Sequence, residues 1–224
     1  MNLTAIITAC GDNGYVLEKN IKNFMGKSVL CHTIALCHES GLFGEIIVLT
    51  DNEKTAVTAR QCDVETHFLP AKETAKTYTI TDDINSEIIK YCKQGKACDE
   101  FCHISSCVPL LNKLILKQAY DQFKKTDADM LIPIVRFSFP IQRALKIKAN
   151  NQIEYCEPKN ASKRSQDLVP IFYDARMFTF QKKAKKSPPK CVPFEIDEKY
   201  VQNIDNDIDW KMAELKYKLM RNKS

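Results

Sequence analysis

Short apolar runs alternate with longer amphipathic segments along the first part of the chain. The runs, several of them rich in β-branched residues, predict buried strands at residues 3–8, 45–49, 65–68, 101–104 and 130–135. The segments between them predict helices at residues 28–40, 53–62, 82–92 and 114–125. Strands separated by helices form βαβ crossovers. We therefore expect an α/β fold, a three-layer sandwich with a mainly parallel sheet and helices on both faces.

Polar residues at the ends of these segments supply the expected boundaries. Gly41 can end the first helix in the left-handed conformation, and Asp51 or Asn52 can cap the second. Ligands of parallel α/β sheets bind at the carboxyl ends of the strands. This rule predicts a ligand-binding site in the loops that follow Thr8, Leu49 and Ile104.

The sequence pattern changes after Phe137. Residues 144–148 and 152–155 alternate with period two around a short polar turn, which predicts a β-hairpin. We expect one domain over residues 1–224, with residues 136–164 forming an antiparallel excursion inserted into the sheet. A late strand is predicted at 200–204 and a closing helix at 207–220. The candidates for the buried face of that helix are Trp210, Ala213, Leu215 and Leu219.

Charge and hydropathy limit the classes of partner. Lys and Arg exceed Asp and Glu by 33 − 28 = 5, which suits an anionic small substrate and does not demand nucleic acid. The basic segment 181–190 lacks interleaved aromatic residues, so we interpret it as a solvated loop. There is no apolar run of about 18 residues, and the N-terminus lacks the basic start of a signal peptide. We expect a cytoplasmic protein that does not span a membrane.

Ten cysteines are scattered over the chain. Without a secretion signal they are expected to be reduced thiols. The tightest group is Cys98, Cys102, His103 and Cys107. It lacks the paired Cys-x-x-Cys spacing of most structural zinc sites, so buried thiols are favoured over a metal.

Four segments, taken together, resemble one enzyme family. They are residues 19–30, which begin Lys-Asn-Ile-Lys; residues 40–43; residues 137–145 followed by 164–168; and residues 201–205 followed by 209–210. In this order and spacing the chain resembles the acylneuraminate-type cytidylyltransferases, and the pseudaminic acid branch in particular. The resemblance covers essentially the whole chain. It implies a Rossmann-like fold of the nucleotide-diphospho-sugar transferase type and a homodimer that pairs through residues 136–164.

The resemblance also implies a reaction and a set of site residues. The enzyme would transfer CMP from CTP to a nine-carbon nonulosonic acid, sialic-like and of the pseudaminic type among others, and release pyrophosphate. Lys19 would neutralise phosphate charge, and Asp205 would hold Mg²⁺, whose preference is for hard oxygen ligands. The implied nucleotide-binding residues are Ala9, Gly11, Lys19, Asn20 and Lys27. The implied sugar-binding residues are Gln142, Arg143, Arg164 and Gln166.

Differences from the family pattern leave alternatives open. Cys10 and Leu69 stand where the family has arginines, and Asn203 stands where it has the first of two metal-binding aspartates. A catalytically degenerate relative that binds a sugar acid or a protein is therefore a second hypothesis. A nucleotidyltransferase with a changed nucleotide or sugar is a third.

The site residues also have structural interpretations. Lys19 can be an ordinary surface lysine. Asp205 can be the cap of the closing helix. Arg164 can form a local ion pair with Asp167.

Overall fold

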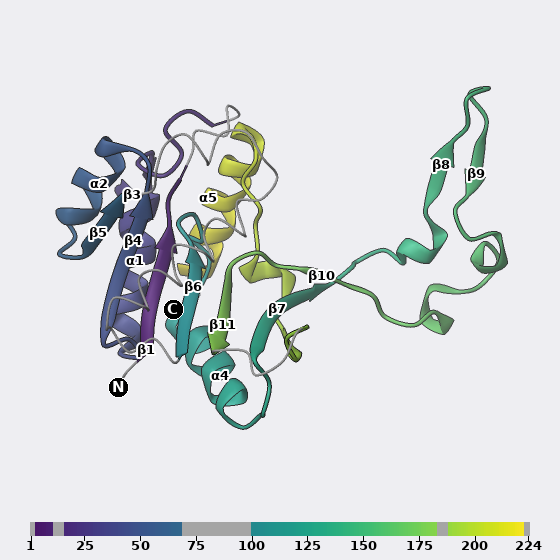
Figure 1. The fold of residues 1–224 in the computed structure, drawn as a ribbon. Coiled ribbons are helices and arrows are strands. Elements are labelled where there is room, and N and C mark those ends of the chain that lie inside the picture. The colour runs from purple at the N-terminus through teal and green to yellow at the C-terminus, as the bar shows by residue number, and fades with distance from the viewer. Residues whose placement is uncertain (1–2, 11–15, 69–99, 183–187, 222–224) are drawn as a thin grey trace.

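The computed structural model describes residues 3–10, 16–68, 100–182 and 188–221. Within them, eight strands form one mixed sheet with the order β10-β7-β11-β6-β1-β4-β5 and β12 paired to β7 (Figure 1). The bounds are β1 Leu3–Thr8, β4 Glu45–Thr50, β5 Glu65–Phe68, β6 Glu100–Ser105, β7 Met130–Arg136, β10 Phe172–Asp174, β11 Phe178–Lys182 and β12 Cys191–Glu195. Strands β6, β1, β4 and β5 are parallel neighbours, whereas β11 is antiparallel to both β6 and β7.

Both faces of the parallel strands are buried. Leu3, Ala5 and Ile7 of β1 belong to the main hydrophobic cluster on one face. The alternate residue Ile6, together with Ile47 of β4, is about as deeply buried. Because successive side chains of a strand point to opposite faces, this burial means that the sheet is covered on both sides. The predicted three-layer, mainly parallel α/β fold is confirmed.

Local capping explains where the helices begin and end. The described helices are α1 Val29–Ser40, α2 Glu53–Arg60, α4 Lys113–Lys124 and α5 Asp207–Arg221. Ser28 caps α1 by accepting a hydrogen bond from the Cys31 amide, and Asn52 caps α2 by accepting one from the Thr55 amide. Gly41 ends α1 at a φ of 63°, in the left-handed region predicted for it. The predicted helix at 82–92 lies outside the described residues.

The segment between β7 and β10, residues 137–171, projects from the sheet and is called the arm (Figure 1). It contains the predicted hairpin, whose strands β8 Leu145–Ile147 and β9 Ile153–Tyr155 pair antiparallel with each other. Asn151 makes the turn at a φ of 61°, which asparagine tolerates better than most residues. The arm exposes large apolar side chains, among them Phe139, Ile147, Ile153 and Val169.

Two predictions about the last third of the chain are wrong. The expected strand at 200–204 has no sheet partner; a 3₁₀ turn, Glu198–Tyr200, precedes extended backbone whose residues Val201 and Ile204 are buried. The late strand is instead β12. In α5, Trp210 and Ala213 are buried as predicted, but Leu215 and Leu219 are exposed. The helix is buried mainly near its start, against Phe24 and Val29.

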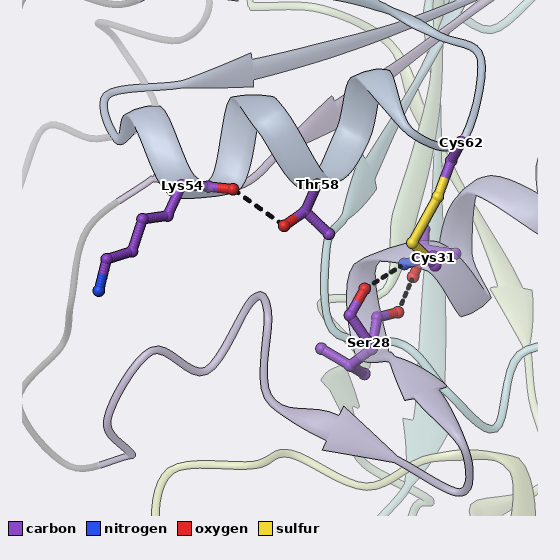
Figure 2. Close-up of a disulfide and its surroundings, with 7 residues drawn as sticks. Ser28, Cys31, Lys54, Thr58 and Cys62 are labelled. Carbon is purple, nitrogen blue, oxygen red and sulfur yellow. Dashed lines mark hydrogen bonds between the residues drawn. A yellow bond between two sulfur atoms is a disulfide. The ribbon is translucent and has the colours of Figure 1, made fainter.

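The expectation that all the thiols are reduced is also wrong for one pair. Cys31 in the first turn of α1 is joined by a disulfide to Cys62, just after α2, with the two Cα atoms 6.4 Å apart (Figure 2). The bond ties together two helices that are consecutive in the chain. Among the described residues, no helix is both long and apolar enough to cross a bilayer.

Candidate nucleotide-binding site

The carboxyl ends of three parallel strands meet at one edge of the sheet. Thr8 of β1 is paired with Leu49 of β4 on one side and with Ser105 of β6 on the other. At this edge lies a cavity of about 150 Å³, between the turn that follows β1 and the start of α2. Its lining residues are Glu18, Lys19, Asn20, Ile21, Asp51, Asn52 and Thr55. The cavity therefore occupies the position at which parallel α/β sheets bind their ligands.

Lys19 and Asp205 come from opposite ends of the chain, and the segments that carry them are in contact. The Lys19 ammonium donates a hydrogen bond to the carbonyl oxygen of Ile204, the residue before Asp205. A second contact joins the same two segments, because Lys22 Nζ lies 2.9 Å from a carboxylate oxygen of Asp207. Lys22 also lies 4.8 Å from the centre of the Trp210 ring. The structure thus brings the segment that carries Lys19 into contact with the segment that carries Asp205, and the phosphate and metal roles of the two residues stay predictions.

Asp205 does not cap the closing helix. The cap is Asn206, whose Oδ1 accepts hydrogen bonds from the amides of Ile208 (2.8 Å) and Asp209 (3.0 Å). The Asp209 carboxylate completes the arrangement by accepting hydrogen bonds from the backbone amides of Asp205 and Asn206. The carboxylate of Asp205 takes no part in this capping, and the residue is exposed. Its acidic group is therefore available to a ligand.

Asn20 faces the cavity from a position fixed by its neighbours. Its backbone carbonyl accepts a hydrogen bond from the Leu30 amide at 3.1 Å. Its side-chain Oδ1 accepts a hydrogen bond of 2.7 Å from the hydroxyl of Ser106, which is buried. Ser106 was not among the site residues predicted from the sequence. Its position directly after β6, at the ligand edge of the sheet, is the signal by which it could have been found.

The other predicted nucleotide residues lie outside the lining of this cavity. Ala9 is buried, and both its backbone groups bind β4: its amide donates to the Leu49 carbonyl and its carbonyl accepts from the Thr50 hydroxyl, each at 2.8 Å. Lys27 is exposed on a two-strand ribbon, β2 Asn23–Phe24 and β3 Lys27–Ser28. Gly11 lies outside the described residues. The nucleotide roles of these three residues stay predictions.

The loop after β1 is less basic than the family pattern, as Cys10 and Glu18 show. The Cys10 thiol is close to the Leu49 carbonyl. Burial, followed by the nearby charge of Asp51, raises the pKa of Cys10 to about 12, so this thiol is uncharged at neutral pH. Glu18 forms an ion pair with Lys54 at the start of α2. That lysine offsets the acidic charge that Glu18 brings to the cavity.

A second, larger cavity lies at the base of the arm. Its volume is about 370 Å³, and it is bounded by the carboxyl ends of β7 and β12 and by the arm. Gln142 lines it and is buried; its amide nitrogen donates to the Val169 carbonyl at 2.7 Å, and its Oε1 has no hydrogen-bond partner among the described residues. Of the four predicted sugar-binding residues, Gln142 is the one that lines this cavity.

The three remaining sugar-side residues lie on the exposed surface of the arm. Arg164 binds the Asp167 carboxylate through two hydrogen bonds, of 2.9 and 3.2 Å, so the ion pair considered from the sequence exists. Arg143 and Gln166 are exposed. None of the three lines the 150 Å³ cavity, and Figure 1 shows the arm extending away from the sheet. One chain alone therefore does not place these residues at its own nucleotide cavity.

Four residues were considered as a possible zinc site from the sequence: Cys98, Cys102, His103 and Cys107. Cys98 lies outside the described residues. His103 Nε2 is 2.9 Å from the Thr8 hydroxyl, and burial lowers its pKa to about 4, so the ring is neutral at pH 7. Cys102 is fully buried in the core. In the part of the chain that the structure describes, no group of three or more His, Cys, Asp or Glu residues is placed to hold a metal ion.

A mainly parallel sheet with a lysine and an asparagine lining a cavity at its carboxyl edge is the arrangement of an α/β ligand-binding protein. Comparison with known proteins makes the class specific. The family model described as cytidylyltransferase matches residues 4–208. The chain belongs to this family, and it is a nucleotidyltransferase.

Several curated relatives match along almost the whole chain. The pseudaminic acid cytidylyltransferase of Campylobacter jejuni strain 81-176 is 31% identical over 226 residues, covering 98% of this chain and 97% of the relative. The N-acylneuraminate cytidylyltransferase A of Danio rerio is 25% identical over 95% of this chain, which spans about half of that protein.

Solved structures share the fold at lower identity. A CMP:2-keto-3-deoxy-manno-octonic acid synthetase complexed with CTP superposes with a TM-score of 0.69 at 10% identity, covering 99% of both chains. The 4-diphosphocytidyl-2C-methyl-D-erythritol synthase of Anaerococcus prevotii gives a TM-score of 0.61 at 11% identity, covering 95% of this chain and 96% of that one.

Proposed function

We propose that this cytidylyltransferase transfers CMP from CTP to a nine-carbon nonulosonic acid of the pseudaminic or sialic type, releasing pyrophosphate. The observation that supports the proposal is the contact between Lys19, which lines the cavity at the ligand edge of the sheet, and the carbonyl of Ile204, the residue before Asp205. The full-length match to a pseudaminic acid cytidylyltransferase supports the choice of sugar acid.

The proposed reaction requires that the two substrates be positioned and that the negative charge of the phosphates be neutralised. An oxygen of the sugar acid attacks the α-phosphorus of CTP, the bond from that phosphorus to the bridging oxygen breaks, and pyrophosphate leaves. Such displacements depend on electrostatic stabilisation of phosphate oxygens more than on covalent catalysis. Lys19 would supply positive charge from the cavity wall, and Asn20 would hydrogen-bond the nucleotide.

The residues present fit a Mg²⁺ ion held jointly by protein and substrate. Mg²⁺ usually takes one or two protein carboxylates and completes its shell with water and substrate phosphates. Asp205 offers one exposed carboxylate, and Lys19 contacts the residue before it. When bound, the ion would neutralise phosphate charge and favour departure of pyrophosphate.

The sugar-acid side of the proposal requires a second copy of the chain. Gln142, Arg143, Arg164 and Gln166 are proposed to bind the sugar acid, the arginines through charge-assisted hydrogen bonds to its carboxylate. All four belong to the arm, which leaves the sheet. We propose a homodimer that pairs through the arm, because the exposed apolar side chains Phe139, Ile147 and Ile153 need a covering surface. In such a dimer the arm of one copy can reach the nucleotide site of the other.

A cytoplasmic location is part of the proposal, because nucleoside triphosphates are intracellular substrates. In that compartment thiols are mostly kept reduced, and disulfides are usually transient or redox-sensitive. The Cys31–Cys62 bond is then expected to respond to the redox state of the cell. The basic segment 181–190 and the net charge of +5 give no reason to add a nucleic acid as partner.

A panel of nucleotides tests the proposed activity. The protein is incubated with Mg²⁺, pseudaminic acid or N-acetylneuraminic acid, and CTP, UTP, ATP or GTP in turn, and products are identified by mass spectrometry. A CMP-sugar from CTP is the expected product. A nucleotide-sugar from another triphosphate supports the altered-substrate alternative, and sugar binding without any product supports the degenerate one. Neither alternative has support from the relatives described above.

A further inference from the structure

Ser106 holds the side chain of Asn20 from behind the nucleotide cavity. Its hydroxyl donates a hydrogen bond of 2.7 Å to Asn20 Oδ1. Ser106 is buried and does not line the cavity, whereas Asn20 is half-buried and does. The serine can therefore influence a ligand only through the asparagine.

The backbone of Ser106 is fixed on two sides. Its amide donates to the carbonyl of Thr8 at the end of β1, at 3.2 Å. Its carbonyl accepts a hydrogen bond of 2.8 Å from the hydroxyl of Thr33, a buried residue of α1. The hydroxyl of Ser106 is thus presented to Asn20 from a rigid platform made by a central strand and a helix, which is the support that a precise binding site requires.

This bond determines which end of the Asn20 amide faces the ligand. An asparagine side chain has one acceptor oxygen and one NH₂ group with two donors. Since Oδ1 is held by Ser106, the NH₂ group is the end left for the cavity. Lys19 lines the same cavity, so its wall combines a neutral hydrogen-bond donor with a cationic side chain. Such a wall suits an oxygen acceptor, and the phosphates of a nucleotide are rich in these.

We propose that Ser106 is a positioning residue for CTP, which orients the Asn20 amide so that its NH₂ group donates to an oxygen of the nucleotide. The inference rests on the proposed function and deepens it. Without the hydroxyl, Asn20 can rotate or present its oxygen instead. Because loss of the Ser106 hydroxyl removes one ordinary hydrogen bond, the apparent affinity for CTP should fall about five- to tenfold.

The test uses the full-length protein and compares two adjacent serines. Ser106→Ala removes the bond to Asn20, and Ser105→Ala is the matched control, because the Ser105 hydroxyl donates a bond of the same 2.7 Å to the Arg176 carbonyl. The readouts are the Kd of CTP with Mg²⁺ by calorimetry, the KM for CTP, the KM for the sugar acid and the Tm. Ser106→Ala should raise the Kd and KM for CTP while leaving the KM for the sugar acid unchanged, and Ser106→Thr should restore both values.

Two variants of Asn20 keep the proposal falsifiable if Ser106→Ala does not fold. Asn20→Asp keeps the shape of the side chain but puts an oxygen in place of the NH₂ group, so it should weaken CTP binding at least as much as Asn20→Ala. In the Asn20→Ala background, Ser106→Ala should have no further effect on CTP binding. A wild-type Kd for CTP in Asn20→Asp would overturn the proposal.

Failure of the positioning role can be separated from failure of the proposed function. If the wild-type protein binds CTP but gives no product, the proposed activity fails, while the Kd values still decide the role of Ser106. If Ser106→Ala and Ser105→Ala change Kd and Tm alike, Ser106 is merely structural and the proposal is overturned. If the wild-type protein does not bind CTP, both are overturned.

Discussion

The ammonium group of Lys19 donates a hydrogen bond to the carbonyl of Ile204, 185 residues away in the chain. This contact joins the loop after the first strand to the segment before the last helix. It brings Lys19 against the residue before Asp205, the one acidic side chain of the family pattern that remains at this position.

Removing the Lys19 ammonium should weaken catalysis. A charge-assisted contact to phosphate contributes about 1.5–3 kcal/mol, so Lys19→Ala should lower kcat/KM for CTP by roughly ten- to 150-fold. Steady-state kinetics measure the change. Lys211→Ala, at an exposed position on α5, removes a lysine from the same half of the molecule and should leave kcat/KM within twofold. Equal losses in the two variants would point to net charge rather than to Lys19.

A second prediction concerns the binding of the sugar acid by the arm. Arg164→Lys keeps the charge but loses the planar fork that binds a carboxylate through two hydrogen bonds. The KM for the sugar acid should rise about tenfold, because one charge-assisted hydrogen bond is lost. Lys159→Arg, a charge-conserving change elsewhere on the exposed arm, should have no effect. An unaltered sugar KM in Arg164→Lys would remove that residue from the site.

Pairing of the arms predicts a dimer that can be broken. Ile147 and Ile153 lie directly opposite each other in the hairpin and are 75% and 67% exposed. A combined Ile147→Asp and Ile153→Asp variant should sediment as a monomer with a nearly unchanged Tm, because neither side chain belongs to the core. Wild-type protein that sediments as a monomer well above micromolar concentration would contradict the dimer.

The disulfide predicts a stability that depends on redox state. Closing the loop between Cys31 and Cys62, 31 residues apart, stabilises the folded state by about 3–4 kcal/mol on chain-entropy grounds. Denaturant unfolding with and without dithiothreitol should show this difference. Cys31→Ser should lose the response to the reductant, whereas Cys156→Ser, which alters a free, exposed thiol, should keep it. An identical unfolding midpoint under both conditions would argue against the bond.

Burial of His103 predicts a pH dependence. Its folded-state pKa of about 4 lies below the ordinary 6.5, so folding favours the neutral ring. The associated stability is fully present above pH 6.5 and is lost as the pH falls through 4, by about 3–3.5 kcal/mol in all. Unfolding free energies measured across this range should show less acid sensitivity in His103→Gln, which cannot titrate. Equal sensitivity in both proteins would assign it to other groups.

The fold could be predicted largely from its central strands. Strands such as β1 and β4 are buried on both faces, so they appear in the sequence as continuous apolar runs. The strands β10, β11 and β12 were missed because they are short and partly exposed, and their pairing with β6 or β7 is decided by tertiary contacts. The alternating pattern at 200–204 reflects residues that are buried without joining the sheet.

The site could be predicted in part for similar reasons. Lys19 and Asp205 carry charge at loop positions next to recognisable motifs, and in the structure Lys19 contacts the residue before Asp205. Ser106 carries no such signal, because its importance lies in one hydrogen bond to a residue far away in the sequence. The pairing of Cys31 with Cys62 likewise depends on how α1 packs against α2, which no local pattern encodes.

Release of pyrophosphate from CTP is the most direct test of the central claim. The wild-type protein with Mg²⁺ and CTP should release pyrophosphate when pseudaminic acid or a related nonulosonic acid is added, and only background without it. Asp205→Ala should abolish this release and still unfold cooperatively. No release with any nonulosonic acid, alongside saturable binding of the sugar acid, would contradict the account and identify the protein as a binding scaffold.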